Sequence, residues 1–140
     1  MLSFKVPVPP VAKARPRVTM RGGYARAYTP KKSADFEKLV ASLCPATEPM
    51  TGPLHLSIKF MLPIPKSWSK AKQRAAESGE IMPTSRPDID NYVKAIMDSL
   101  NGIAYADDSQ IVSLNAQKVY SAEPGIDIIV AARALHCSSG

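Results

Sequence analysis

Apolar and polar residues alternate in several short stretches of the chain, which is the pattern of half-buried strands. This alternation predicts four strands, over residues 2–8, 54–63, 110–122 and 125–134. In the second of them, the alternate residues from Leu54 to Phe60 are apolar and share one face. We expect the last two strands to pair as a hairpin around Pro124-Gly125, because turn-forming residues separate them.

Other stretches carry a single apolar stripe at helical spacing. One helix is predicted to start at Thr29, a candidate cap, with Pro30 in the first helical position, and to stop at Pro45. Its stripe consists of Phe36, Leu39, Val40 and Leu43. A second helix is predicted to end at Asn101-Gly102. Its stripe consists of Ile89, Val93, Ile96, Met97 and Leu100.

The remaining segments are polar or rich in turn-forming residues. Residues 9–28 contain Pro and Gly at several positions and are expected to form an extended loop, whereas residues 66–79 predict a short exposed helix. The resulting order is β-α-β-(α)-α-β-β, without an internal repeat. We therefore expect a single domain over residues 1–140, of the α/β or α+β class, with a mixed sheet covered by helices.

Length and composition restrict the class of protein. The chain has 140 residues, of which 45% are hydrophobic and 21% charged, enough for one domain with its own core. No apolar run approaches the roughly 20 residues of a membrane span, and the first residues do not resemble a secretory signal. Cys44 and Cys137 are too far apart to indicate a disulfide framework or a zinc site. We expect a cytoplasmic protein without a membrane partner.

Charge changes this picture, because it is unevenly distributed. The net charge is +6, yet residues 1–32 hold eight Lys and Arg and no acid, while the remainder is net negative. Arginines interleaved with tyrosines and glycines favour a loop that binds nucleic acid over a solubilising tail. The candidate DNA-binding residues are Lys13, Arg15, Arg17, Arg21, Arg26, Lys31, Lys32 and, farther along, Arg86.

Aspartates gather at two places in the acidic part of the chain. Asp88 and Asp90 open the second helix, and Asp107-Asp108 precede the third strand. Positions two apart diverge by about 200° on a helix, so Asp88 and Asp90 converge only if Asp88 still belongs to the extended lead-in. Clustered carboxylates are ligands for Mg²⁺, which with water and phosphate can drive phosphodiester hydrolysis. Lys94 is placed to bind a phosphate oxygen.

Simpler roles exist for each of these residues. Acids in a first helical turn cap the helix or favour its dipole. Asp90 and Lys94, four residues apart, are also spaced for a surface ion pair. Asp107-Asp108 suit a turn. The pattern is not an EF-hand, because the glycine and the distal glutamate are missing.

The stretch RPDIDNYVKAIMDSLNGIAYADDSQIV resembles the signature of the RusA family of endodeoxyribonucleases, Holliday-junction resolvases often found in phages and prophages. The shared positions are Asp88, Asp90, Asn91, Lys94, Asp107, Asp108 and Val112. The segments KARPRVT (13–19) and YTP (28–30) also resemble the N-terminal loop of phage-type members. The resemblance covers roughly residues 3–130, and its motif elements occur in order with the expected separation.

This resemblance implies Mg²⁺-dependent hydrolysis of branched DNA, with Mn²⁺ as a substitute ion, by a homodimer that acts in recombination and repair. It implies that Asp88, Asp90 and Asp108 are metal ligands and that Lys94 assists catalysis. Asp107 and Asn91 would be accessory residues. A two-fold dimer also matches the symmetry of a four-way junction. The implied location is the cytoplasm of a bacterium or of a phage-infected host cell. The excursion over residues 64–86 is longer than in the shortest members, and its role is open.

Two other functions fit the same residues. A non-catalytic DNA-binding protein of this fold would share the basic segment, but it would not need Asp88, Asp90 and Asp108 together. A nuclease of single strands or of RNA would keep the chemistry and change the substrate, and phosphate contacts do not discriminate between these substrates.

Overall fold

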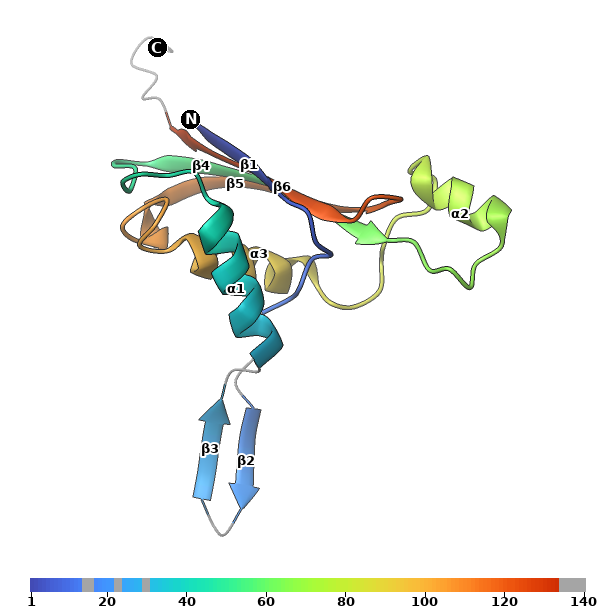
Figure 1. Cartoon of the computed structure of the whole chain (residues 1–140), viewed down its shortest axis with the longest axis horizontal. Helices are drawn as coiled ribbons and strands as arrows, with labels where there is room; N and C mark the ends of the chain where they lie inside the picture. Colours follow the sequence, from blue (N-terminus) through green and yellow to red (C-terminus); the bar gives the residue numbers. More distant parts are fainter. Residues whose placement is uncertain (14–16, 22–23, 29–30, 134–140) are drawn as a thin grey trace.

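A computed structural model of the chain describes residues 1–13, 17–21, 24–28 and 31–133. Its centre is a mixed sheet with the strand order β1-β6-β4-β5 (Figure 1). These strands are β1 (Leu2–Val6), β4 (Leu54–Pro63), β5 (Ile111–Ser121) and β6 (Gly125–Ala132). The helices are α1 (Lys31–Leu43), α2 (Lys70–Glu77), α3 (Ile89–Leu100) and a short 3-10 helix, η1 (Asp108–Gln110). The α+β class and the mixed sheet are as the sequence predicts.

The predicted hairpin between the last two strands is wrong. β4 lies between them, parallel to β5 and antiparallel to β6, and β6 pairs on its other side with β1. The physical reason is burial. β4 alternates cleanly and gains a partner on both edges, whereas β5 exposes Val112 and Leu114 and suits the edge of the sheet. The parallel β4–β5 pair requires a long crossover, and residues 64–110 supply it with α2 and α3.

The extended loop expected over residues 9–28 is also wrong. β2 (Arg17–Arg21) and β3 (Tyr24–Tyr28) pair as an antiparallel hairpin, with Arg17 opposite Tyr28 and Arg21 opposite Tyr24. Two short runs separated by two glycines are a hairpin signal, so the sequence contained the pattern. Figure 1 shows the hairpin projecting from the helical side of the sheet. Thr29 and Pro30, the predicted start of the first helix, lie outside the described residues.

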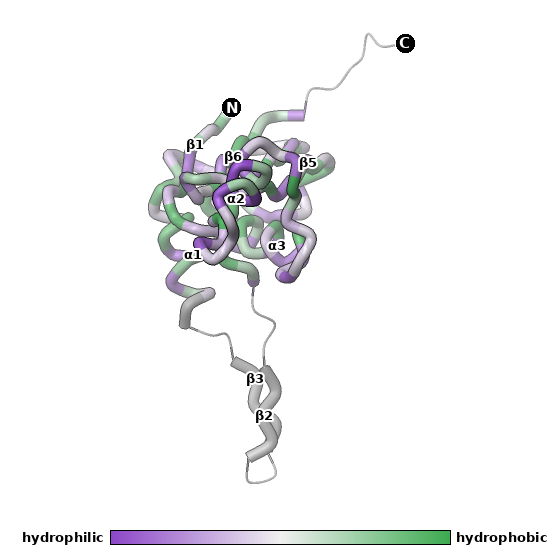
Figure 2. The backbone as a smooth tube through the Cα atoms, turned by 90° about the vertical axis from the view of Figure 1, so that its right-hand side faces the viewer, coloured by the Kyte–Doolittle hydropathy of each residue, from purple (hydrophilic) through white to green (hydrophobic). Residues whose placement is uncertain are grey.

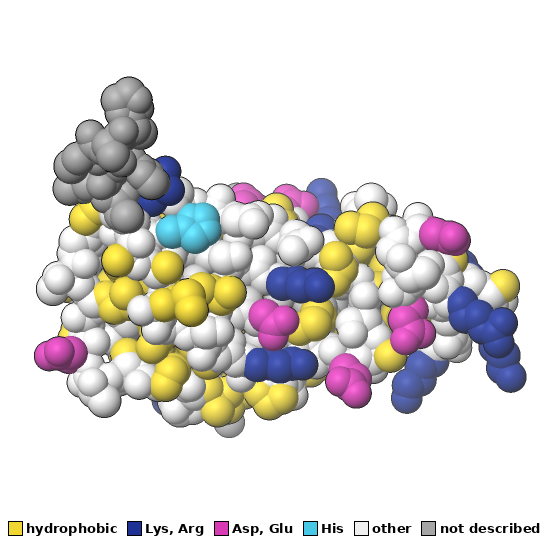
Figure 3. Space-filling model, turned by 90° about the horizontal axis from the view of Figure 1, so that it is seen from above, with side chains coloured by type: hydrophobic (Ala, Val, Ile, Leu, Met, Phe, Trp, Pro, Cys, Tyr) yellow, Lys and Arg dark blue, Asp and Glu magenta, His cyan; other side chains and the backbone are white. Residues whose placement is uncertain are grey.

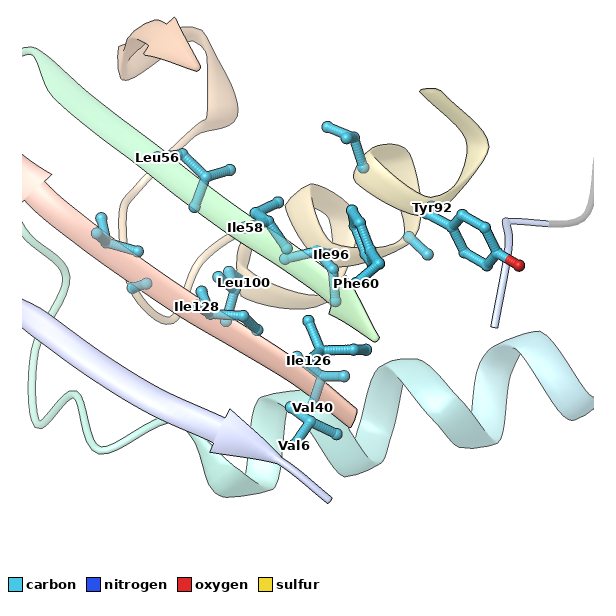
Figure 4. Close-up of a cluster of buried hydrophobic side chains, with 14 of the residues drawn as sticks. Val6, Val40, Leu56, Ile58, Phe60, Tyr92, Ile96, Leu100, Ile126 and Ile128 are labelled. Atoms are coloured by element: carbon cyan, nitrogen blue, oxygen red, sulfur yellow. The ribbon is translucent and has the colours of Figure 1, made fainter. Parts of the chain in front are cut away.

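The hydrophobic core lies between one face of the sheet and the layer formed by α1 and α3 (Figure 4). β4 contributes Leu54, Leu56, Ile58 and Phe60, which are at most 1% exposed. They meet Ile126, Ile128 and Val130 of β6, Ile96 and Leu100 of α3, and Val40 of α1. Leu43, predicted to belong to the buried stripe, is 38% exposed at the end of α1. Figure 2 shows apolar stretches concentrated in this packed body.

The opposite face of the sheet is covered by neither α1 nor α3, and the end of α2 borders it near Met61 and Val119. Along it, the register places Lys5, Asp127 and Lys59 side by side on three neighbouring strands. Figure 3 looks onto this face and shows charged side chains mixed with apolar ones. None of the described helices is long and apolar enough to cross a membrane.

Candidate active site

The start of α3 carries the first two candidate carboxylates. Asp88 is the N-cap residue with an extended backbone (φ −69°, ψ 150°), and its side chain makes no capping hydrogen bond. Asp90 lies in the first turn, and both side chains are exposed. Asp88 therefore belongs to the extended lead-in, which is the condition for these two carboxylates to approach the same ion or phosphate.

Lys118 of β5 holds the segment that leads to Asp88. Its Nζ donates to the carbonyl oxygens of Ser85 and Pro87, each at 3.0 Å. Hydrogen bonds from a charged donor are stronger than neutral ones. Lys118 thus fixes the backbone immediately before Asp88 against the edge strand of the sheet.

Lys94, one turn after Asp90, is paired with a different aspartate. Its Nζ donates to Asp98 Oδ1 at 2.9 Å. The alternative of an Asp90–Lys94 ion pair is not what the structure contains, and Asp90 makes no ion pair with any of the described residues. The carboxylate of Asp90 therefore remains available to an external cation.

Asp98 accepts a second ammonium group, from Lys13. The Lys13 Nζ lies 3.3 Å from Asp98 Oδ2 and 2.8 Å from Glu37 Oε1 of α1. The backbone N–H of Lys13 also donates to the carbonyl of Asn91 at 2.9 Å. The root of the β2–β3 hairpin is thereby tied to α3 at two points, and Lys13 is engaged inside the protein.

These contacts change the acidity of both lysines. The hydrogen bond and negative charge of Asp98 raise the pKa of Lys94, and the charge of Asp108 adds to the effect. For Lys13, partial burial lowers the pKa, but hydrogen bonds and charges from Glu37 and Asp98 outweigh it and raise the pKa. Both side chains are therefore cationic at neutral pH.

The turn before β5 gives the two adjacent aspartates different roles. The Asp107 carboxylate caps η1 by accepting from the Ser109 N–H at 3.1 Å. Hydrogen bonding from the Ser109 side chain, and then from the Ser109 N–H, lowers the pKa of Asp107. Gln110 completes a capping box, because its Oε1 accepts from the Asp107 N–H at 3.1 Å. Its Nε2 donates to the carbonyls of Met50 and Gly52. Asp107 and Gln110 therefore build the turn.

Asp108 is left free by this arrangement. It is half-buried and forms no ion pair with any residue in the described ranges. Its negative charge raises the pKa of Lys94 and contributes, after burial, to raising that of Tyr105. The Tyr105 hydroxyl donates to the carbonyl of Met97 in α3 at 2.8 Å, which joins the turn to the helix. The negative charge of Asp108 therefore acts on Lys94.

The donor set suits a hard divalent cation. Within the described ranges, no three His, Cys, Asp or Glu side chains are gathered closely enough to hold a metal ion by themselves. Mg²⁺ does not need such a cage, since it usually binds through one or two carboxylates and keeps water and phosphate oxygens as its other ligands. The carboxylates of Asp88, Asp90 and Asp108 have no ion-pair partner among the described residues and are of the type that such an ion binds, although the structure does not gather the three into one ligand cluster.

The predicted DNA-binding residues are only partly described. Arg15 lies outside the described residues. Arg17, Arg21 and Arg26 have their backbone in the hairpin, and Lys31 and Lys32 begin α1, but their side chains are not described. Arg86 is exposed two residues before Asp88.

Three residues that the sequence analysis missed organise the site: Asp98, Gln110 and Lys118. Asp98 could have been found from its spacing of four residues after Lys94, a helical ion-pair spacing. Gln110 could have been found from the Asp-x-x-Gln capping pattern. Lys118 had no sequence signal, because its partners lie about 30 residues away.

Comparison with known proteins identifies the family of the chain. The family model described as "Endodeoxyribonuclease RusA" matches residues 7–131. "Uncharacterized protein YqaN" of Bacillus subtilis (strain 168) is 41% identical over 134 residues, which cover 92% of this chain and 94% of that protein. "Crossover junction endodeoxyribonuclease rusA" of Lactococcus phage r1t is 39% identical over 79 residues, about half of each chain. The chain belongs to the RusA family of endodeoxyribonucleases.

Proposed function

We propose that this protein is a Mg²⁺-dependent endodeoxyribonuclease that resolves Holliday junctions by paired, symmetric cuts in DNA recombination and repair. Family membership supports an endonuclease of crossover junctions. The observation that carries the metal-dependent mechanism is the separation of roles among the acids. Asp98 and Asp107 bind other residues of the same chain. Asp88, Asp90 and Asp108 have no ion-pair partner among the described residues.

Asp88, Asp90 and Asp108 would hold the ion in this proposal. Mg²⁺ would supply a polarised water as nucleophile and stabilise the leaving oxygen of the phosphodiester. Asp98 keeps Lys94 charged and oriented, so Lys94 can meet a phosphate oxygen without a large rearrangement. Lys118 holds the backbone before Asp88, and Gln110 holds the turn that presents Asp108. Mn²⁺, which has similar ligand preferences, is expected to substitute for Mg²⁺.

The substrate and assembly follow from the same proposal. The hairpin carries the basic residues that would contact phosphates of the junction arms. Two cuts related by the symmetry of the junction require two sites, and a two-fold homodimer provides them. Light scattering coupled to size-exclusion chromatography would give twice the mass of the chain. The expected setting is the cytoplasm of a bacterium or phage-infected host.

The test is a cleavage assay on a synthetic four-way junction with Mg²⁺, beside matched duplex, single-stranded DNA and RNA. We expect paired nicks at symmetric positions of the junction and no cleavage in EDTA. Binding of the junction without cleavage under either Mg²⁺ or Mn²⁺ would support a non-catalytic DNA-binding protein instead. Preferential cleavage of single strands or RNA would show that the proposed substrate is wrong, while the proposed metal-dependent hydrolysis would stand.

A further inference from the structure

The excursion between β4 and α3, residues 64–87, is a built structure anchored to the body of the protein. At its entry, the Trp68 ring packs edge-on against Tyr120 of β5, with ring centres 5.3 Å apart. At its exit, Lys118, two residues earlier on the same strand, holds the carbonyls of Ser85 and Pro87. Residues two apart on a strand share a face, so one face of β5 fixes both ends of the excursion.

The interior of the excursion is equally well defined. Ser69 caps α2 by accepting from the Lys72 N–H at 3.2 Å. The Gln73 side chain donates to the carbonyl of Trp68 at 2.8 Å, which holds the entry loop against the helix. Ala76 is buried at 1% exposure. These contacts give the excursion a defined structure, so its exposed side chains are held in place relative to the body of the protein.

The excursion presents positive charge to solvent. Four Lys and Arg lie within nine residues, without an acid among them: Lys66, Lys70, Lys72 and Arg74. Lys72 lies over the Trp68 ring, 4.1 Å from its centre. Lys66, Lys70 and Arg74 are exposed and form no ion pair with any described residue. Lys70 and Arg74 lie one helical turn apart and so share a side of α2.

The first turn of α2 carries charges of the sign that the helix dipole disfavours. Acids favour the first turn of a helix and bases the last. The first turn of α2 holds Lys70 and Lys72 and no acid, whereas the last turn holds both Arg74 and Glu77. Local helix stability therefore does not account for Lys70 and Lys72 in the first turn, whereas contact with an external polyanion would.

The location of the excursion matches a DNA contact. Figure 1 shows α2 projecting from the end of the sheet and the hairpin projecting from the helical side, with α3 between them. Figure 3 shows Lys and Arg side chains at the tip of the end formed by α2, beside acidic ones. The exit of the excursion leads directly into Asp88. A duplex arm at the acidic site would pass within reach of both projections.

We propose that residues 64–87 form a second DNA-binding arm, which contacts the phosphate backbone of a duplex arm through Lys66, Lys70 and Arg74. The proposal rests on the proposed function for the identity of the polyanion as DNA. Each phosphate contact releases counterions and adds about 0.9 to the slope of log affinity against log salt concentration. Three contacts would thus account for a slope difference of about 2–3.

The experiment compares two triple variants of the full chain. One is Lys66→Ala, Lys70→Ala and Arg74→Ala. The matched control removes the same charge elsewhere, by Lys5→Ala, Lys38→Ala and Arg133→Ala, all at exposed positions. Binding to a four-way junction and to a matched duplex is measured by fluorescence anisotropy without metal, from 50 to 300 mM salt. Circular dichroism confirms that both variants are folded.

We expect the arm variant to lower the slope by about 2–3 on both DNAs, while the control keeps the wild-type slope. Trp68 is the only tryptophan of the chain and sits in the arm, so its emission should change along the binding curve of the wild type. Equal slopes for the arm variant and the control would overturn the proposal. Wild-type protein that binds junctions without cutting them would refute the nuclease function alone. The salt dependence of binding would still show whether the arm contacts DNA.

Discussion

Replacement of Lys118 by methionine should impair cleavage without unfolding the protein. Methionine keeps the aliphatic stem and removes the ammonium group, so two hydrogen bonds to the carbonyls of Ser85 and Pro87 are lost, both 3.0 Å long. A hydrogen bond from a charged donor contributes about 1.5–3 kcal/mol. Because both bonds are solvent-exposed, we take about 1 kcal/mol for each, or about 2 kcal/mol together.

This loss should act locally, on the segment that positions Asp88. About 2 kcal/mol corresponds to a roughly 30-fold increase in the open population of residues 85–88. Displacement of a catalytic group by about 1 Å can cost about 100-fold in rate. We therefore expect the single-turnover rate of junction cleavage to fall by about 10- to 100-fold, with an unchanged dissociation constant for the junction.

The assay combines single-turnover cleavage with hydrogen exchange of the backbone amides of residue 86 and residues 88–91. Lys59→Met is the matched control, because Lys59 is exposed on the neighbouring strand and donates no side-chain hydrogen bond to a described residue. Lys118→Arg keeps a cationic donor and should restore most of the rate. If Lys118→Met cleaves as fast as Lys59→Met, the position of Asp88 does not depend on this contact and the reasoning is refuted.

Two further predictions concern the core and the turn before β5. Ile96→Ala truncates a fully buried side chain of α3 and should lower the free energy of unfolding by about 2–5 kcal/mol. Urea denaturation measures this change. A loss below about 1 kcal/mol would mean that α3 is not packed as described. Asp107→Asn keeps an oxygen that can cap η1 and should retain most of the cleavage activity. Asp108→Asn removes an unpaired carboxylate and should abolish cleavage. The opposite result in the cleavage assay would exchange the roles of the two aspartates.

Local patterns predicted the elements that carry the site. β4 and α3 were predicted nearly to their ends, because their apolar residues recur at the spacing of a strand and of a helix. The hairpin of β2 and β3 differs from the predicted loop because the prolines before it favour irregular structure, although its two-glycine turn is a local hairpin signal.

The non-local part of the structure could not be predicted from patterns. The insertion of β4 between β5 and β6 depends on which strand gains most by burial on both edges, and short sequence windows do not contain this comparison. The ion pair between Lys13 and Asp98 and the contacts of Lys118 also join residues that are distant in sequence. The sequence thus predicted which carboxylates are candidates, and the structure separated those that are engaged from those that are available.

The central claim is that the unpaired carboxylates cut DNA while the basic surfaces bind it, and Asp90→Asn tests this claim most directly. Asparagine preserves the shape of aspartate and removes one negative charge from a group that faces phosphate, so the fold and junction binding should persist or binding should tighten. The hard anionic oxygen that holds Mg²⁺ is lost. The measurement is a gel-shift titration without metal beside a cleavage time course with Mg²⁺ on the same junction. We predict wild-type or tighter binding with no cleavage, whereas cleavage at the wild-type rate, or loss of both activities in a folded variant, would contradict the account.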